Sequence, residues 1–140
     1  MEGITIRPIK EEDYVFINEW WKDIGKAPPP RNLLPENGLH GLMACKGGRP
    51  IVCNYIYLTN SKFAYSDYMI SDTNYKGRDR YDIVLELMNM SIGAAWELGY
   101  EDFWFITKNK GMLKRCKSLG VKVSEEPYYL ICSSNSKKEI

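Results

Sequence analysis

Apolar positions recur with two different periods along this 140-residue chain. Residues 3–8 (GITIRP) alternate and are rich in β-branched side chains, which predicts a first strand. Residues 11–21 (EEDYVFINEWW) instead repeat apolar side chains at helical spacing after an acidic first turn, so they predict a helix that ends near Gly25. The clustered prolines of residues 26–38 remove backbone donors and predict a long surface loop without regular structure.

Three strands in succession are expected next, at residues 38–46, 50–59 and 62–72. The sequence GGR between the first two is a good hairpin turn. Residues 81–98 then place their apolar side chains in one helical stripe, and Gly99 is placed to end that helix.

The rest of the chain predicts short elements and a tail: a strand at 101–107, a helix at 110–120, closing strands at 121–125 and 128–133, and a polar tail at 133–140. The order β-α-loop-β-β-β-α-β-α-β-β predicts an α+β domain in which the middle strands form an antiparallel meander. We expect one domain over residues 1–132, because the length suits a single compact unit.

Composition removes several classes of function. The formal net charge of +1 disfavours a nucleic-acid partner, because such proteins are usually strongly basic. The sequence shows neither a signal peptide nor a long apolar span, so we expect a cytoplasmic protein and no membrane partner. The cysteines form no CxxC pair and His40 has no second ligand nearby, so we expect no metal and reduced, mostly buried thiols.

One charged stretch has two interpretations. Residues 70–84 (ISDTNYKGRDRYDIV) place Lys76, Arg78 and Arg80 around Gly77, immediately before the long helical stripe. Such a loop could bind a phosphate group at the helix N-terminus. It could equally be a solvated, charged turn that caps the helix.

The element order and three motifs resemble the GNAT superfamily of acetyl-CoA-dependent N-acetyltransferases. The opening ITIRPIKEEDY is similar to the family's first strand and helix start. The other two motifs are a pyrophosphate loop, matched by Asp72, Tyr75, Lys76 and Gly77, and a later motif, matched by Asn109 and by Leu119, Gly120 and Val121. The resemblance implies a three-layer α/β/α sandwich around a mixed, mostly antiparallel central sheet.

The resemblance also implies a set of contacts to acetyl-CoA, which would be a cosubstrate. The family's fourth strand splays from the fifth, pairs with the pantetheine arm and leads into the pyrophosphate loop. The corresponding cofactor-binding residues are Met69, Ile70 and Ser71 on the strand, Lys76, Gly77, Arg78, Asp79 and Arg80 in the loop, and Asn109 in the later motif.

Two departures from the family pattern concern binding and catalysis. Asp79 and Tyr81 replace the small residues of the pyrophosphate loop, and Asp79 adds a negative charge there. Cys116 replaces a tyrosine that is usually assigned to protonating the leaving thiolate. Neighbouring cations could lower the pKa of Cys116 for this catalytic role, whereas the alternative is a small buried thiol on the inner face of a helix.

Asp67 is the leading candidate for the catalytic base, because it lies near the expected thioester site. Its alternative is an exposed strand carboxylate. Strict alternation would send Asp67 and Tyr68 to opposite faces of the sheet. Glu126 is a weaker candidate, and His40 is more often structural.

The first helix and the following loop shape the acceptor site in the family. Trp20 and Trp21 are both candidate contacts to substrate. They are adjacent, so they cannot both face the core; one of them would pack inward, and the other could line a groove together with the proline loop. Tyr68 is a further candidate contact to substrate. The tandem tryptophans before Pro-Pro-Pro loosely resemble small acetyltransferase-like proteins of bacteriophages.

Two functions therefore stand. The first is direct transfer of an acetyl group from acetyl-CoA to a primary amine, with general-base assistance. The second is a degenerate GNAT-like binding or assembly module, which the altered loop and the missing tyrosine favour. The sequence leaves open the amine, which could be a small molecule or a protein, and leaves open whether the chain forms a homodimer.

Overall fold

In a computed structural model, one five-stranded sheet forms the centre of the protein. The structure describes residues 3–107, 109–124, 126, 129 and 131–133. The strands are β1 (Ile4–Pro8), β2 (Gly41–Lys46), β3 (Arg49–Leu58), β4 (Phe63–Ser71) and β5 (Asp102–Phe105). They are ordered β1-β2-β3-β4-β5; the first four are antiparallel neighbours, and β5 runs parallel to β4.

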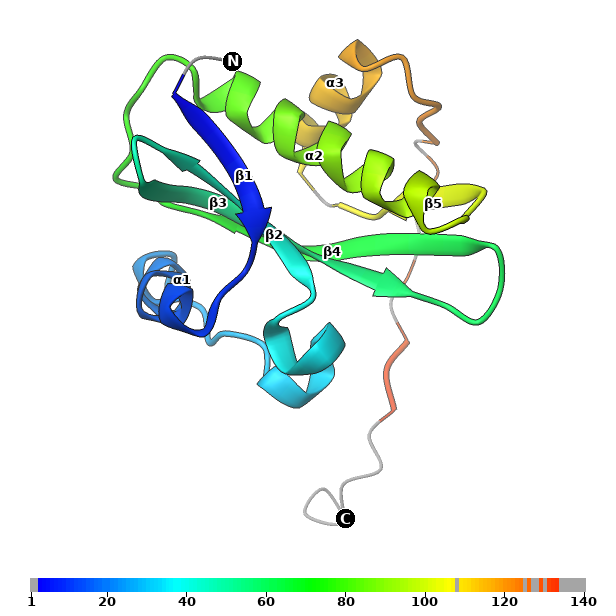
Figure 1. Cartoon of the computed structure of the whole chain (residues 1–140), viewed down its shortest axis with the longest axis horizontal. Helices are drawn as coiled ribbons and strands as arrows, with labels where there is room; N and C mark the ends of the chain where they lie inside the picture. Colours follow the sequence, from blue (N-terminus) through cyan, green and yellow to red (C-terminus); the bar gives the residue numbers. More distant parts are fainter. Residues whose placement is uncertain (1–2, 108, 125, 127–128, 130, 134–140) are drawn as a thin grey trace.

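Helices cover both faces of this sheet. The helices are η1 (Glu11–Asp13), α1 (Tyr14–Asp23), η2 (Arg31–Leu33), η3 (Pro35–Gly38), α2 (Arg80–Glu97) and α3 (Lys110–Ser118). Figure 1 shows α1 on one side of the sheet and α2 and α3 on the other. The prediction of a three-layer α+β sandwich is confirmed.

Two hydrophobic cores result from these layers. The α1-side core contains Ile17 and Trp20 of α1, packed on strand residues such as Cys53 and Tyr55. The α2-side core contains the helical stripe of α2 together with other strand residues and with Met112 and Cys116 of α3. Strands β2 and β3 therefore contribute side chains to both cores, and both of their faces are buried.

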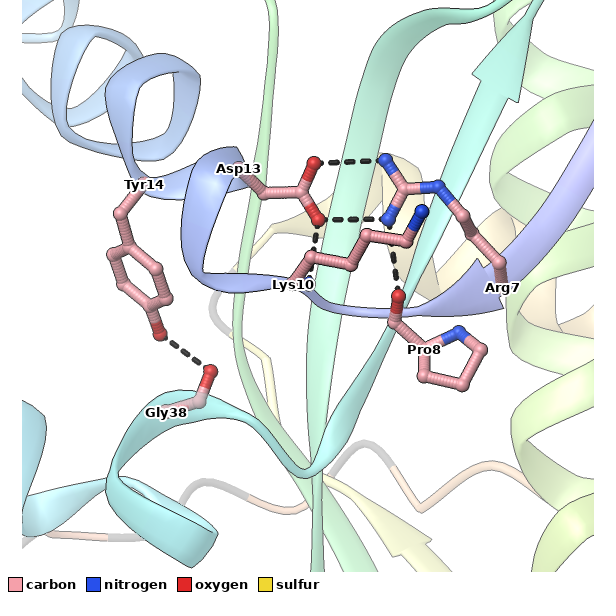
Figure 2. A network of polar contacts seen from close by, with 6 residues as sticks. All are labelled: Arg7, Pro8, Lys10, Asp13, Tyr14 and Gly38. Carbon is pink, nitrogen blue, oxygen red and sulfur yellow. Dashed lines mark hydrogen bonds and ion pairs between the residues drawn. The ribbon is translucent and has the colours of Figure 1, made fainter.

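The start of α1 is fixed to the sheet by a buried carboxylate. Figure 2 shows the Arg7 guanidinium donating two hydrogen bonds to Asp13, at 2.7 and 2.8 Å. The backbone N–H of Lys10 donates to the same carboxylate at 2.7 Å. In the next residue, the Tyr14 hydroxyl donates to the carbonyl oxygen of Gly38 at 2.6 Å. Strand β1, helix α1 and the proline loop thus meet at one helix end.

The β2–β3 hairpin turns at the predicted GGR sequence, with Gly47 and Gly48 as the turn and Arg49 already in β3. Gly47 and Gly48 both have positive φ, 55° and 82°, which the favoured hairpin turns require and side-chain-bearing residues resist. The turn places Lys46 directly opposite Arg49. Two cations therefore project from the end of this hairpin.

Two predictions about regular structure were wrong. The proline loop contains two short 3₁₀ turns, η2 and η3, because prolines fit the first position of a helical turn. Residues 121–124, expected to begin a closing strand, are described and form no strand. Residue 125 of the first expected closing strand lies outside the described residues. So do residues 128 and 130 of the second expected strand and residues 134–140 of the expected tail.

Candidate functional site

Strands β4 and β5 stop pairing halfway along β4. Their last paired residues are Ser66 and Phe105, whereas β4 continues to Ser71. Over residues 67–71, β4 has β3 as a partner on one side and no partner strand on the β5 side among the described residues. Unpaired strand groups at such a divergence can bind an extended ligand by adding backbone hydrogen bonds.

A β-bulge lies where the two strands diverge. The β3–β4 register shifts between the pairs Cys53–Ile70 and Tyr55–Asp67, and Tyr68 has a φ of 57°. Bulges interrupt strict alternation and are frequent next to active sites. Tyr68 packs against the same α1-side core that contains Tyr55. The prediction that Asp67 and Tyr68 occupy opposite faces was therefore wrong, because the bulge turns both toward the α1 side.

Asp67 is half-buried at this point. Its Oδ1 accepts a hydrogen bond from the backbone N–H of Tyr68 at 2.7 Å. Asp67 is also the first β4 residue beyond the last pair with β5. A carboxylate thus lies at the opening between the strands, where a general base would be needed.

Arg80 holds the loop that follows β4. Its guanidinium donates to the Ser71 hydroxyl at 2.5 Å and to the carbonyl oxygens of Asp72 and Tyr75 at 2.6 and 3.3 Å. Arg80 therefore fixes the loop to the first turn of α2, and its donors are directed at the protein itself.

Cations of the β2–β3 hairpin neutralise the two acidic residues of the loop. Lys46 pairs with Asp79, and Arg49 pairs with Asp72 at 2.8 Å. The hydrogen bond from Lys46 is the main cause that lowers the pKa of Asp79. For Asp72, burial alone would raise the pKa, but the hydrogen bonds from Arg49 and from a backbone N–H outweigh it and lower the pKa.

Tyr75 covers the glycine of the loop. Its hydroxyl donates a hydrogen bond to the Asp79 carboxylate, and a Cβ at Gly77 would collide with the Tyr75 ring and hydroxyl. Lys76 and Arg78 are exposed, and within the described part of the chain their side chains make no hydrogen bond, ion pair or cation–π contact. Since the first N–H groups of a helix lack partners within the helix, these two cations and the start of α2 suit an anion.

Comparisons with known proteins identify the fold. No protein-family model matches the sequence, and no curated protein matches it. Solved structures do match it with probability 1.00. A Trypanosoma brucei acetyltransferase has a TM-score of 0.64 at 15% identity, covering 92% of this chain and 99% of the other. An aminoglycoside acetyltransferase from an uncultured soil metagenomic sample has a TM-score of 0.67 at 16% identity, covering 95% and 97%.

A third match is a Salmonella typhimurium protein solved with its cofactor acetyl-CoA. Its TM-score is 0.63 at 17% identity, covering 88% of this chain and 82% of the other. The chain has the GNAT fold. The resemblance seen in the sequence would place acetyl-CoA between the diverging strands and against the loop before α2.

The residues of the loop and strand fit such a ligand. Residues 69–71 lie beyond the last pair between β4 and β5, so on the β5 side no described strand pairs with them. The carboxylate of Asp79 is neutralised by Lys46 rather than left as an uncompensated charge. Of the three predicted phosphate-binding cations, Lys76 and Arg78 are exposed, while Arg80 is occupied within the loop.

Asn109 caps helix α3. Its Oδ1 accepts hydrogen bonds from the backbone N–H groups of Gly111 and Met112, at 2.8 and 3.4 Å. This is the usual role of an asparagine at a helix N-cap. The amide Nδ2 has no partner among the described residues. Asn109 can therefore donate a hydrogen bond to a bound ligand through Nδ2 while its Oδ1 caps the helix.

Cys116 is 8% exposed and packs in the α2-side core. Burial raises the pKa of the Cys116 thiol, and the nearby Arg115 only partly opposes this shift. The prediction of a lowered pKa was wrong, because desolvation of the thiolate outweighs the attraction of a neighbouring cation. The structure therefore shows the alternative, a small thiol on the inner face of the helix.

The tandem tryptophans divide as expected, although Trp20 is not available to substrate. Trp20 is 3% exposed in the α1-side core, so its predicted substrate contact is wrong. Trp21 is partly buried against the same core. Glu126 is exposed. His40 Nδ1 lies 2.6 Å from the carbonyl oxygen of Ile56, which is a structural contact.

Sequence reasoning missed the hairpin cations. Lys46 and Arg49 flank the GG turn, and the available signal was that these two cations could pair with the carboxylates of Asp72 and Asp79 in the loop before α2. It also missed a row of aromatic side chains on β3, β4 and β5, considered below.

Other features bear on function within the described residues. No group of three or more potential metal-ligating His, Cys, Asp or Glu side chains occurs there. No helix in that part combines the length and apolarity needed to cross a membrane. Two surface depressions, of about 290 and 180 Å³, lie along α2 against Leu119 and against β1, and none of their lining residues belongs to β4 or β5.

Proposed function

We propose that the protein is an N-acetyltransferase that transfers an acetyl group from acetyl-CoA to a primary amine. The observation that supports it most is the divergence of β4 and β5, with Asp67 at its start and the loop before α2 at its end. Among proteins of the same fold, one was solved with acetyl-CoA and another is an aminoglycoside acetyltransferase. Residues 1–132 are proposed to form the single catalytic domain.

In this proposal, each part of the site has one task. The backbone of residues 69–71 pairs with the pantetheine arm, and Asn109 Nδ2 donates to it. Lys76, Arg78 and the first N–H groups of α2 hold the pyrophosphate. Hairpin residues Lys46 and Arg49 keep the loop carboxylates neutralised. Acetyl-CoA supplies an activated thioester.

Asp67 acts on the acceptor. An amine is protonated near neutral pH and must lose a proton before its nitrogen can attack a carbonyl carbon. Asp67 takes that proton directly or through a water molecule. The new C–N bond replaces the C–S bond of the thioester, and the CoA thiolate leaves and becomes a thiol by taking up a proton. Such proton transfer contributes typically about 10²–10⁴-fold to a rate.

Two measurements test the proposal. Calorimetric titration of the full chain with acetyl-CoA should show binding, and thiol release in the presence of an amine panel should exceed the background rate. Asp67→Asn should reduce turnover by about 10²-fold or more while acetyl-CoA still binds. Glu97→Gln, an exposed carboxyl at the far end of α2, is the matched control and should turn over normally.

A degenerate binding module is the second candidate. The specific observations in its favour are that Tyr75 covers Gly77 and that Cys116 is buried. Acetyl-CoA binding without thiol release for any amine would establish this second candidate. Absence of acetyl-CoA binding at millimolar concentration would overturn the acetyltransferase and leave the degenerate module, whereas thiol release above background that falls in Asp67→Asn would overturn the degenerate module.

A further inference from the structure

Four aromatic side chains form a continuous row across three strands. Register places Tyr57 of β3 opposite Tyr65 of β4, and Tyr65 opposite Trp104 of β5. The rings of Tyr57 and Tyr65 stack at 4.6 Å with an interplanar angle of 8°, and Phe63 stacks on Trp104 at 4.6 Å. Phe63 also lies 6.4 Å from Tyr65. We refer to these four residues as the aromatic row.

The aromatic row lies on the α1 side of the sheet, but its β5 end is uncovered. Tyr57 packs at the edge of the α1-side core, whereas Trp104 is 55% exposed. Cross-strand aromatic pairs alone would stabilise the sheet by about 0.2–1 kcal/mol each. That role does not require one of the largest apolar side chains to stand half in water, and contiguous exposed aromatic surface often marks a ligand site.

The row leads to the opening between β4 and β5. Asp67 lies two residues beyond Tyr65 on the same face, a step of about 7 Å along the strand, because both pair with α1-side residues of β3. Burial is the main cause that raises the pKa of Tyr57, and the charges of Tyr68, Tyr65 and Asp67 add to it. The Asp67 carboxylate is therefore within electrostatic range of the rings.

From this juxtaposition, we infer that the acceptor is a primary amine with a flat, apolar body, such as an arylalkylamine, which stacks on the aromatic row with its nitrogen at Asp67. The inference rests on the proposed function and names its substrate class. Rings attract both a flat apolar group and a nearby ammonium. An amine two carbons from a ring has a reach of the same order as the step from Tyr65 to Asp67.

The same surface suits a polycation less well. One carboxylate, Asp67, lies at the opening. A second acidic residue on this face is Asp102, which pairs with Phe63 at the far end of the row and is exposed. The surface between these two carboxylates consists of the aromatic row, and Lys62 lies next to Asp102 at the end remote from Asp67. An aminoglycoside or a polyamine would find few partners for its additional charges.

Competition between amines tests the inference on the full chain. Acetylation of 2-phenylethylamine, spermidine and kanamycin is compared by kcat/KM, with acetyl-CoA saturating. We expect 2-phenylethylamine to be preferred. Trp104→Ala should raise its KM about two- to tenfold, as for the loss of one aromatic contact, and leave the KM for acetyl-CoA unchanged. Trp96→Ala removes a tryptophan of α2 that is 48% exposed and should change neither value.

The outcomes separate the two proposals. If spermidine or kanamycin is preferred, and Trp104→Ala has no effect, the inference is overturned while the proposed function stands. If no amine is acetylated, saturation-transfer NMR of 2-phenylethylamine with the protein alone decides the inference. Binding that is lost in Trp104→Ala and kept in Trp96→Ala supports it, and absence of binding overturns it.

Discussion

Tyr68 has a backbone conformation that residues with side chains rarely adopt, with a φ of 57°. Such a conformation costs on the order of 1–3 kcal/mol and persists only where the surroundings enforce it. Here the bulge is held by β3 on one side and by packing of the Tyr68 ring against the α1-side core. The strained residue is therefore the one next to Asp67. The bulge places the Asp67 side chain on the α1 side of the sheet, the same side as the aromatic row.

Cys116 offers a direct test of catalytic and structural roles for one thiol. Because Cys116 is buried in the α2-side core, Cys116→Ala should lower the free energy of unfolding by about 1 kcal/mol. The rate of thiol release from acetyl-CoA should stay at the wild-type value. Urea unfolding and steady-state kinetics measure the two effects. Cys132→Ala changes an exposed cysteine and should alter neither the free energy of unfolding nor the rate of thiol release. If Cys116→Ala alone causes a large loss of turnover, Cys116 would again be the candidate acid that protonates the CoA thiolate.

At the scale of elements, the start of α1 depends on Asp13. Burial alone would raise the pKa of Asp13, but the hydrogen bonds from Arg7 and from the Lys10 N–H outweigh it and lower the pKa. A lowered pKa in the folded state means that the stabilisation is present above the unfolded pKa, near 3.9. It is lost as the pH falls below that value and through the folded pKa.

Asp13→Asn should therefore lower the free energy of unfolding by about 2 kcal/mol at pH 7. The difference from the wild type should shrink as the pH falls from about 5 toward 2. Urea midpoints across that range measure it. Asp23→Asn changes an exposed residue at the other end of the same helix and should leave the midpoint close to that of the wild type. A difference that is constant with pH would contradict the role of the charge.

The β2–β3 hairpin and the loop before α2 act as one unit, because Lys46 pairs with Asp79. Lys46→Met should weaken acetyl-CoA binding severalfold, since it leaves Asp79 uncompensated beside the phosphates. Asp79→Asn should strengthen binding. Both effects should diminish at 0.5 M salt, which screens exposed charges. Titration calorimetry measures them, with Lys22→Met on α1 as the control. Equal affinity in all variants would show that the hairpin takes no part.

The sequence predicted the elements better than the site. Strand alternation, the α2 stripe and the paired glycines of the hairpin are local patterns, and each produced an element at about the expected residues. The bulge at Tyr68 depends on the register between β3 and β4. The pairing of Lys46 with Asp79 joins residues 33 positions apart. Such contacts follow from tertiary packing, so local periodicity could not predict them.

At the scale of the whole molecule, the sheet separates two cores, and each contains thiols without disulfides. Cys45 and Cys53 lie in the α1-side core and Cys116 lies in the α2-side core. Burial is the main cause that raises the pKa of all three thiols. The folded protein therefore keeps protons that the unfolded chain loses at alkaline pH.

This difference predicts how stability depends on alkaline pH. A raised folded pKa means that the stabilisation is complete below the unfolded pKa, near 8.5 for cysteine, and is lost as the pH rises from there through the folded pKa. The free energy of unfolding should thus fall above about pH 8.5, by up to about 1.4 kcal/mol per pH unit for each buried thiol. Urea midpoints measured in reducing buffer between pH 7 and 10 give this slope.

Variants identify the groups responsible. Cys53 is fully buried, so Cys53→Ala should be less stable than the wild type at pH 7 but should lose stability more slowly above pH 8.5, because one titrating group has been removed from the unfolded chain. Cys132→Ser removes an exposed thiol outside both cores, so its curve should run parallel to that of the wild type. If the stability curve of Cys53→Ala also runs parallel to that of the wild type, the loss of stability at alkaline pH arises from other groups. Tyr14 and Tyr55 would be varied next, because burial also raises the pKa of both hydroxyls.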